Sequence, residues 1–546
     1  MWNHLVHMKK QSALFYLLVG AILQFTTGCE GQTDPGAAAA SKVASVLRRG
    51  NGGDPRTLDP SLAEDVHAFN VLRDLYEGLV TEAADGSLVP GVARDWNVSD
   101  DGLRYTFNLR DDAVWSNGQQ VTANEFVASI RRALSSESES PYAFLLYPIL
   151  NAEAVSAGDL DISNLGVRAP DPSTLVIELT APAGFFPGIL AMPIAFPLYS
   201  AGNFDRKQFA DPGIFVGNGP YVLKEWQPGS RIRLGKNLRF RAADTVSVET
   251  IEYFSIEDPN TELSMYRAGE LDITATIPPA QFASMRLDRP DEILISPGLA
   301  LYYIALDLSE PPMDNLALRQ ALTMAIDREM LVDIIGRGER PAFGIVPDNV
   351  AGHRNARFSW QNESQEELNR RARTLYSQAG YGPGKPLAFT LLYDAGDIHE
   401  TVALAVTSMW NDVLGAEVTL DKREWQYFLD TRNNRADWQA MRFAWFGDYN
   451  DASTFLDIFH SDSAQNLSGF HSQEYDELLD VISQTLDSDQ RSGNTHQAEM
   501  HLLNANPVIP LYFFVSKHLV SPRVRNYQPN ILDVHRSQYI ELMREE

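Results

Sequence analysis

Several stretches of the chain alternate apolar and polar residues with a period of two, which is typical of a half-buried β-strand. The clearest are Leu103, Tyr105, Phe107 and Leu109, and further along Leu175, Ile177 and Leu179. Each series predicts a strand with one face on a hydrophobic core.

Other stretches have the helical period and clear start signals. Thr122-Ala-Asn-Glu125 is a capping box that predicts a helix running towards Leu134. A second box, Ser364-Gln-Glu-Glu367, precedes an apolar helix face, and Gly380 suits the end of that helix. The face consists of Leu368, Ala372, Leu375, Tyr376 and Ala379. Mixed strand and helix signals without internal repeats predict an α/β architecture.

The N-terminal region has a short apolar run from Ala13 to Leu23 after Lys9 and Lys10. Eleven residues are too few for a helix that crosses the bilayer, which needs roughly 20. They suit the apolar core of a signal peptide instead. A thiol soon after such a core, here Cys29, is typical of a lipoprotein site at which the cysteine is lipidated.

We therefore expect a lipoprotein signal peptide over residues 1–28 and a small, polar, flexible tether over residues 29–45. The predicted location is the periplasm, with the protein attached to a membrane only through Cys29. Thr26 stands where bacterial lipoproteins usually carry leucine, so an ordinary cleaved signal peptide is the alternative.

Composition narrows the class of protein. The 546 residues hold 45 basic and 72 acidic side chains, a net charge of −27, which disfavours nucleic-acid partners. The single cysteine excludes a disulfide within the chain and disfavours a thiol enzyme. No cofactor or metal site is expected, because neither an HExxH nor a paired-cysteine motif occurs.

Residues 90–134 read PGVARDWNVSDDGLRYTFNLRDDAVWSNGQQVTANEFVASIRRAL. This segment resembles the signature of solute-binding protein family 5 of ABC importers, whose members handle oligopeptides and dipeptides. The resemblance continues in family order over most of the chain. It includes SPYAFLLYPIL (140–150), VGNGPYVLKEW (216–226), LRQALTMAIDREMLV (318–332), LLYDAGDIHETVA (391–403), EWQYFLDTR (424–432) and RFAWFGDYNDASTF (442–455).

The resemblance implies the type II periplasmic-binding-protein fold, with two main lobes, an extra domain and a ligand cleft between the lobes. By analogy, domain I combines residues 42–76, 200–298 and 515–546. Domain II covers 77–199, and domain III covers 299–514. The expected partners are short peptides and the membrane permease of an ABC importer, and the expected state is a monomer.

A receptor for peptides of many sequences must recognise their termini and backbone, which all peptides share. Strand addition recognises the backbone, whereas enclosing the ammonium requires a carboxylate, since an unpaired buried charge is prohibitive. Asp448 in WFGDYND matches the family's ammonium-binding aspartate. Taken alone, Asp-Tyr-Asn-Asp also suits a surface turn.

A peptide lengthens by about 3.3 Å per residue, so peptides of different length place their carboxylates at different points along the cleft. A receptor for several lengths therefore needs several cationic groups there. Arg432, Arg442 and His399 resemble the positions that the family uses in this way, although each also fits a structural role. The family often carries a lysine in the loop 334–341, where this chain has Gly336 followed by Arg337.

Further candidates come from the matched motifs. Aromatic side chains are expected to line the cleft or to belong to the core, and two residues near the first lobe are expected to meet the peptide backbone. The aromatic candidates are Trp425, Trp445, Phe446, Tyr142 and Tyr449, and the backbone candidates are Glu64 and Val66.

The sequence thus favours a non-enzymatic binding protein that delivers peptides to a permease. A ligand-specific receptor on the same fold, for example for cell-wall peptides, is the alternative. An exported hydrolase is the third hypothesis, which the absence of a GxSxG or HExxH motif disfavours.

Overall fold

The computed structural model describes residues 45–199, 206–434 and 438–543. Cys29 and the segments predicted as signal peptide and tether lie outside these residues, except for Ser45. Within the described ranges, no helix has both the length and the apolar character that crossing a membrane requires.

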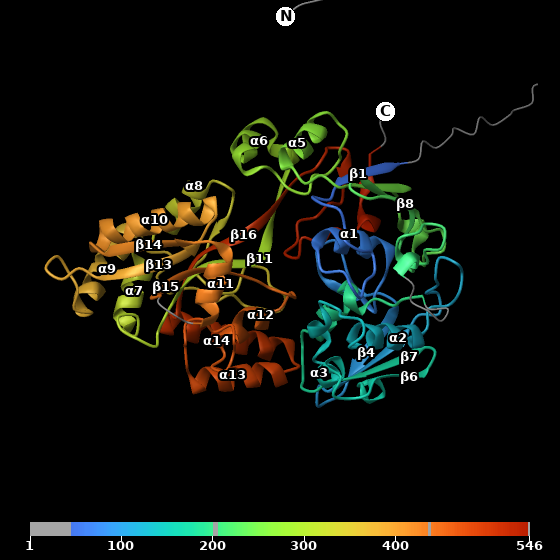
Figure 1. Ribbon diagram of the computed structural model, residues 1–546, viewed down its shortest axis with the longest axis horizontal. Helices are drawn as coiled ribbons and strands as arrows, with labels where there is room; N and C mark the ends of the chain where they lie inside the picture. Colours follow the sequence, from blue (N-terminus) through green and yellow to red (C-terminus); the bar gives the residue numbers. More distant parts are fainter. Residues whose placement is uncertain (1–44, 200–205, 435–437, 544–546) are drawn as a thin grey trace, which may run out of the picture. The chain divides into compact units, whose positions relative to one another are not determined.

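The architecture is mixed α/β, as the sequence predicted, and it contains three larger sheets (Figure 1). The first has the order β1 (Val46–Gly50), β10 (Thr250–Phe254), β9 (Arg231–Lys236), β8 (Tyr221–Gln227). The second has the order β4 (Ala93–Val98), β5 (Arg104–Leu109), β7 (Thr174–Glu178), β6 (Val167–Asp171) and is antiparallel throughout. The third has the order β12 (Arg340–Pro341), β16 (Val508–Leu519), β11 (Ile293–Leu306), β15 (Ala440–Phe446), β13 (Ala388–Asp394), β14 (Glu417–Arg423).

Helices and two small hairpin-like sheets complete the fold. The small sheets pair β2 (Val80–Glu82) with β3 (Leu88–Pro90) and β17 (Val524–Arg525) with β18 (Glu541–Leu542). The helices are α1 (Val66–Leu75), α2 (Ala123–Leu134), α3 (Ala152–Ala157), α4 (Phe186–Leu190), α5 (Pro259–Arg267), α6 (Phe282–Asp288), α7 (Leu316–Met324), α8 (Arg328–Ile335), α9 (Gln365–Gln378), α10 (Asp397–Leu414), α11 (Trp425–Asn434), α12 (Ser453–Leu456), α13 (Gln473–Gln484) and α14 (Ser488–Ala505).

The local sequence signals correspond to these elements. The two period-two series form β5 and β7, which are neighbours in one sheet and bury their alternating apolar residues. The backbone N–H of Thr122 donates to the Glu125 carboxylate at 2.7 Å at the start of α2. Ser364 caps α9, and Gly380 after it has φ +89°, a left-handed conformation that favours glycine.

The longest strands, β11 and β16, are antiparallel neighbours in the third sheet and extend beyond it (Figure 1). Residues 300–306 of β11 are a continuous apolar run, and all of them are buried, as expected for a central strand with both faces covered. The pairing is interrupted between Pro297 and Leu301, which lie opposite Val515 and Phe513. Three residues of β11 therefore lie opposite a single residue of β16, Phe514.

Buried apolar residues form one large core around the third sheet, from Leu301 to Phe513 with Ile531. A second core, from Leu47 to Ile273 with Val524 and Ile540, contains the first two sheets. A small third core lies around α5 and α6 and includes Leu519 at the end of β16.

A buried ion cluster joins the C-terminal segment to α1 and β2. The Arg536 guanidinium donates to Glu82 from Nε at 2.9 Å and from Nη2 at 2.7 Å, and Arg73 Nε donates to the same carboxylate at 3.2 Å. All three side chains are buried. Burial alone would raise the pKa of Glu82, but the two arginines lower it below its usual value.

Replacing Glu82 with Gln should lower the free energy of unfolding by about 3–5 kcal/mol, because two arginines would stay buried without their carboxylate. The lowered pKa means that this contribution is present above the ordinary glutamate pKa and is lost as pH falls through the folded-state pKa. Urea titrations at neutral and acidic pH measure both effects.

Glu178→Gln is the matched control. Glu178 also lies between two arginines, Arg104 at 3.4 Å and Arg168 at 3.6 Å, but all three are solvent-accessible. Its replacement should cost less than about 1 kcal/mol. Equal effects of the two substitutions would show that the buried cluster does not stabilise the fold.

Candidate functional site

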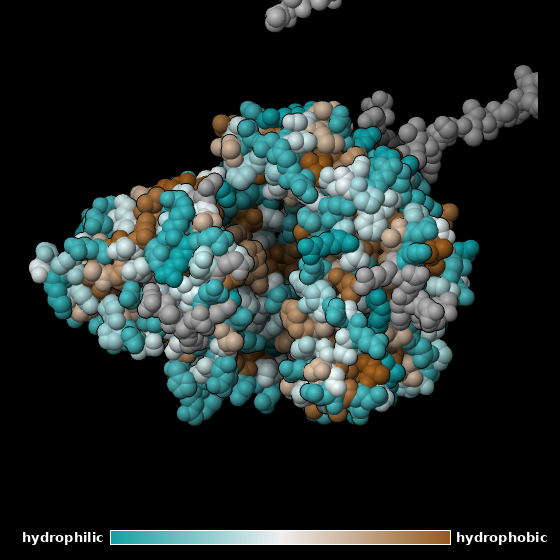
Figure 2. Space-filling model, viewed as in Figure 1, coloured by the Kyte–Doolittle hydropathy of each residue, from teal (hydrophilic) through white to brown (hydrophobic). Residues whose placement is uncertain are grey.

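A cavity of about 1460 Å³ borders the broken part of the β11–β16 pair. Figure 2 shows the surface hollowed in the middle of the molecule, with hydrophobic residues at the rim. The lining combines Gly298, Leu299 and Ala300 of β11 with residues from both large cores. Aromatic and charged side chains also contribute, among them Phe69, Trp96, Phe185, Phe446, Tyr449, Phe514, Arg49, Arg73, Asp448, Arg491, His518 and Asp533.

Asp448 lies in this lining, two residues after the end of β15. Its backbone N–H donates to Thr454 Oγ1 at 3.2 Å. A side chain at the preceding Gly447 would approach Leu299 and Thr454 to 2.8 and 2.9 Å, so the absence of one lets this loop pack against β11. The residue is exposed to the open cavity, yet the surrounding protein partly desolvates its carboxylate and raises the pKa.

Other charged groups around the cavity have partners of opposite charge. Arg491 donates to both oxygens of Asp451 at 2.6 and 2.8 Å, and Arg73 pairs with Glu82. Within the described ranges, by contrast, no ion pair joins Asp448 to a cationic side chain. Its carboxylate is therefore an anionic site that faces the cavity.

Arg442 and His399 lie close together around Asp394, at the end of β13. The Arg442 guanidinium is ion-paired with the Asp394 carboxylate, and His399 Nε2 is 3.9 Å from its other oxygen. Tyr302 also contacts both: its hydroxyl is 3.1 Å from His399 Nδ1, and its ring centroid is 5.8 Å from Arg442 Cζ. Burial, and secondly Arg337, lower the pKa of His399.

Aromatic residues of the cavity wall lie near the group formed by Arg442, His399 and Asp394. Phe514 and Phe446 line the cavity, and their centroids are 5.0 Å apart. The ring centroid of Tyr302, which contacts Arg442 and His399, is 6.2 Å from that of Phe514. Arg442 and His399 themselves are not among the described residues of the lining.

Three other candidates lie around β15 and α11. Arg432 Cζ is 5.6 Å from the ring centroid of Phe443, and the exposed Trp425 stacks on Phe428 at 5.8 Å. Trp445 packs against the large C-terminal core, and its indole N–H is buried without a hydrogen-bond partner in the described structure.

Near α1, Val66 lines the cavity and is 59% exposed. Tyr142 packs edge-on against Phe69 at 5.6 Å. Burial raises the pKa of Tyr142, with smaller contributions from Asp448 and Glu64, so these three residues lie in one region. Glu64 itself accepts a hydrogen bond from Arg56 at 2.6 Å.

The structure gives a reason for glycine at position 336. Gly336 ends α8 with φ +65°, in the left-handed region, and its N–H donates to the Val332 carbonyl. A lysine would be strained in that conformation. Arg337 instead supplies a positive charge near His399, Tyr512 and Lys517.

Sequence reasoning missed several residues of the cavity wall. His518, Asp533 and His535 form a hydrogen-bonded group there, and Phe185 stacks on Tyr449 with centroids 4.4 Å apart. These residues come from distant segments, and the only local signal was the short Asp533-Val-His535 spacing.

Comparison with known proteins defines the class. Residues 87–466 match the model of "Bacterial extracellular solute-binding proteins, family 5 Middle". The chain is 35% identical to the periplasmic murein peptide-binding protein MppA of Escherichia coli over 89% of this chain and 91% of MppA. It is 33% identical to the periplasmic oligopeptide-binding protein OppA of the same organism, over 96% of both. It is also 35% identical to the probable deoxycholate-binding periplasmic protein YgiS of E. coli, over 88% of this chain and 90% of YgiS.

Solved structures agree. An MppA structure described as the unliganded open form gives a TM-score of 0.88 at 34% identity, over 92% of this chain and 98% of that one. A second structure, of E. coli MppA, gives 0.70 at 35% identity, over 92% and 99%. The fold described above is thus more similar to the structure described as unliganded and open than to the second one.

These matches identify an extracytoplasmic solute-binding protein with the periplasmic-binding-protein fold that the sequence predicted. The chain belongs to family 5 of the bacterial extracellular solute-binding proteins. This is a family of binding proteins and not of enzymes, which agrees with the non-enzymatic role expected from the sequence.

The raised pKa of Asp448 makes a prediction for the ligand-free protein. A desolvated carboxylate without a counter-charge destabilises the fold at any pH above its folded-state pKa, and this penalty disappears in acid. Asp448→Asn should therefore raise the thermal unfolding midpoint at neutral pH, by an amount corresponding to no more than about 1 kcal/mol because the residue still contacts solvent.

Asp451→Asn, three residues along the same loop, should have the opposite effect, because it removes the partner of Arg491, whose side chain is only 13% exposed. Thermal melts of the two variants after removal of bound solute test both signs. A lower midpoint for Asp448→Asn would contradict the unpaired-carboxylate interpretation.

Proposed function

We propose that this protein captures short peptides in the cavity and delivers them to the membrane permease of an ABC importer. The observation that carries the proposal is Asp448, a carboxylate that faces the cavity without a cationic partner among the described residues. The names of MppA and OppA, which refer to murein peptides and oligopeptides, support the same class of ligand.

The peptide ammonium is the proposed partner of Asp448. A bound ammonium supplies the missing positive charge and forms a charge-assisted hydrogen bond, which is about twice as strong as a neutral one. The nearby Tyr142, Glu64 and Val66 would form the wall around the first peptide residues.

The peptide backbone is proposed to pair with the broken part of β11 and β16. Gly298 and Ala300 line the cavity where the pairing of these strands is interrupted, and Val515 and Ser516, the adjacent paired residues of β16, line it too. Main-chain groups at an interrupted ladder can bind an added strand whatever its side chains. The buried Ser516 hydroxyl has no partner among the described residues and offers a further hydrogen bond.

The carboxylate end is proposed to meet Arg442 and His399, with Arg432 further along. Because Arg442 and His399 are not among the described residues of the cavity lining, contact would require the wall to rearrange when the lobes close. Trp425 and Trp445 would then pack around the peptide side chains. In the ligand-free protein, the Asp394 carboxylate is proposed to balance the charge of the partly buried Arg442 guanidinium until a peptide carboxylate binds.

We retain the three-domain division as a proposal. The large C-terminal core corresponds to domain III, and its hydrophobic residues support that boundary. Domains I and II share one continuous core, so they are proposed to move as one lobe against domain III.

The lipid anchor is likewise proposed, on Cys29 alone. A tether of this length would hold the body within roughly 25 Å of the membrane and so raise its effective concentration near the permease. Metabolic labelling with a palmitate analogue should mark the wild-type chain and not Cys29→Ser. Equal labelling of both would show that Cys29 is not the lipidated residue, and the proposed binding role would be unaffected.

The first prediction for binding concerns charge. Asp448→Asn should weaken the affinity for tri- and tetrapeptides with free N-termini by about 3 kcal/mol, more than a hundredfold, because the ammonium loses its counter-charge. Isothermal titration calorimetry measures this loss, and Asp412→Asn on the exposed side of α10 is the surface control. Unchanged affinity in Asp448→Asn would remove this residue from the site.

The second prediction for binding concerns the protons released when a peptide binds. Because the free carboxylate has a raised pKa and a bound ammonium would lower it, binding under mildly acidic conditions should release protons and weaken as pH falls. Calorimetry in buffers of different ionisation enthalpy measures the released protons. No release by the wild type, or the same release by Asp448→Asn, would contradict the assignment.

Ligand range separates the general receptor from the ligand-specific alternative. A general peptide receptor should bind several lengths with little sequence preference. Binding of a murein tripeptide alone would favour a specific cell-wall receptor, as the similarity to MppA suggests. Mass spectrometry of co-purifying ligand gives an independent readout.

A further inference from the structure

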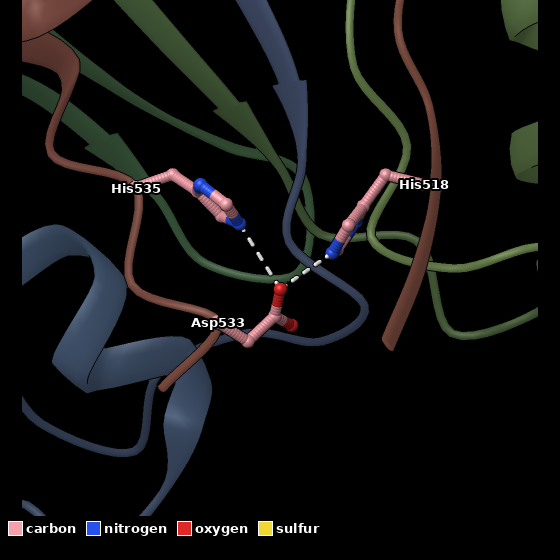
Figure 3. Close-up of side chains that lie close together, drawn as sticks. All are labelled: His518, Asp533 and His535. Carbon is pink, nitrogen blue, oxygen red and sulfur yellow. Dashed lines mark hydrogen bonds and ion pairs between the residues drawn. The ribbon is translucent and has the colours of Figure 1, made fainter. Parts of the chain in front are cut away.

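His518, Asp533 and His535 come together on the cavity wall from two segments of the chain. His518 lies near the end of β16, whereas Asp533 and His535 lie in the segment that follows β17. Figure 3 shows both imidazoles directed at one carboxylate oxygen. The distances to Asp533 Oδ1 are 2.8 Å from His518 Nε2 and 3.0 Å from His535 Nε2, and the three atoms lie within 4.8 Å of one another.

The orientation of His518 is fixed by its second ring nitrogen. Nδ1 is 2.8 Å from the Thr274 carbonyl oxygen, which can only accept, so Nδ1 carries a hydrogen. Nε2 is thereby directed at Asp533. A ligand histidine that donates its other N–H to a backbone carbonyl is the usual arrangement around a protein-bound metal.

The orientations of His535 and Asp533 are also fixed by their surroundings. The His535 ring stacks on Tyr527 with centroids 3.9 Å apart, and its backbone carbonyl accepts a hydrogen bond from Arg49 Nη1 at 2.8 Å. Asp533 has φ +54°, a left-handed conformation that is uncommon outside glycine and turns its carboxylate between the two rings. Three neighbouring ligands are thus oriented before any ion is present.

The three ligand atoms could hold a metal ion if they moved slightly apart. Bonds of about 2.0–2.1 Å in tetrahedral geometry separate ligand atoms by roughly 3.4 Å, a few tenths of an ångström more than the present hydrogen bonds. Two imidazoles and one carboxylate prefer first-row transition ions such as Zn²⁺ over the hard ions Ca²⁺ and Mg²⁺. All three residues line the cavity, so a fourth coordination position would be open towards it.

We propose that His518, Asp533 and His535 bind one divalent first-row transition ion, for which Zn²⁺ is the probe, at the wall of the solute cavity. The sequence predicted peptides as ligands and no metal site, so this ion would be an additional ligand of the protein. It stands independently of peptide capture, because none of its three residues is used to bind a peptide terminus in the proposed function.

Calorimetry with Zn²⁺ on the untagged, chelator-treated mature protein tests the site directly. The expected result is one ion per chain at micromolar or tighter affinity. His518→Gln, His535→Gln and Asp533→Asn should each weaken it at least tenfold. His460→Gln is the matched control, since His460 also lies near an aspartate, with Nε2 3.9 Å from Asp476 Oδ1, but is not part of the proposed site. Excess Ca²⁺ should not compete.

The wild-type protein supplies a second readout that does not depend on how the variants fold. Co²⁺ should give the visible absorption of a low-coordinate nitrogen and oxygen site, and Zn²⁺ should raise the unfolding midpoint with its concentration. The proposal is wrong if the wild type binds no Zn²⁺ at 1:1. It is equally wrong if folded variants bind Zn²⁺ as tightly as the wild type.

Discussion

The antiparallel pairing of β11 with β16 is the constraint on which the site depends. Both strands are central in the third sheet, and β16 also reaches the small core around α5 and α6 through Leu519. Their ladder is interrupted beside the cavity, between Pro297 and Leu301, and shifts again between Tyr302 and Tyr303. Gly298 makes this possible, because a side chain there would approach the Phe514 carbonyl oxygen to 2.9 Å. The same interruption exposes main-chain groups and sets Phe514 against Phe446.

Charge is arranged around the cavity in two ways. Most charged groups of the wall are neutralised locally, as Arg491 is by Asp451 and Arg73 by Glu82. Those pairs stiffen the wall and leave little attraction for a ligand. Asp448 differs, since its desolvation has no compensation within the described structure. A solute with a positive charge offsets this desolvation cost, whereas a neutral solute does not. The cavity should therefore favour ligands that carry an ammonium group.

The sequence predicted the elements whose signals are local. The alternation in β5 and β7 and the capping residues of α2 and α9 depend on contacts a few residues apart, so periodicity and caps suffice to find them. The fold and the family followed from motifs in a fixed order, and the match over residues 87–466 confirms the family.

Long-range pairing set the limit of prediction. Nothing near Arg442 in the sequence indicates that Asp394 neutralises it, or that Arg442 lies outside the described lining of the cavity. The group formed by His518, Asp533 and His535 was missed for the same reason, because β16 and the C-terminal segment meet only in the folded chain. Gly336 was seen as a departure from the family, and its left-handed backbone explains it.

A double-mutant cycle measures the central claim, that Asp448 binds the peptide ammonium. Affinities of wild type and Asp448→Asn for one tripeptide and its N-acetylated form give the coupling between carboxylate and ammonium. If the two groups meet, acetylation should cost about 3 kcal/mol in the wild type and little in Asp448→Asn. Equal costs in both proteins would mean that the ammonium binds elsewhere and would contradict the account.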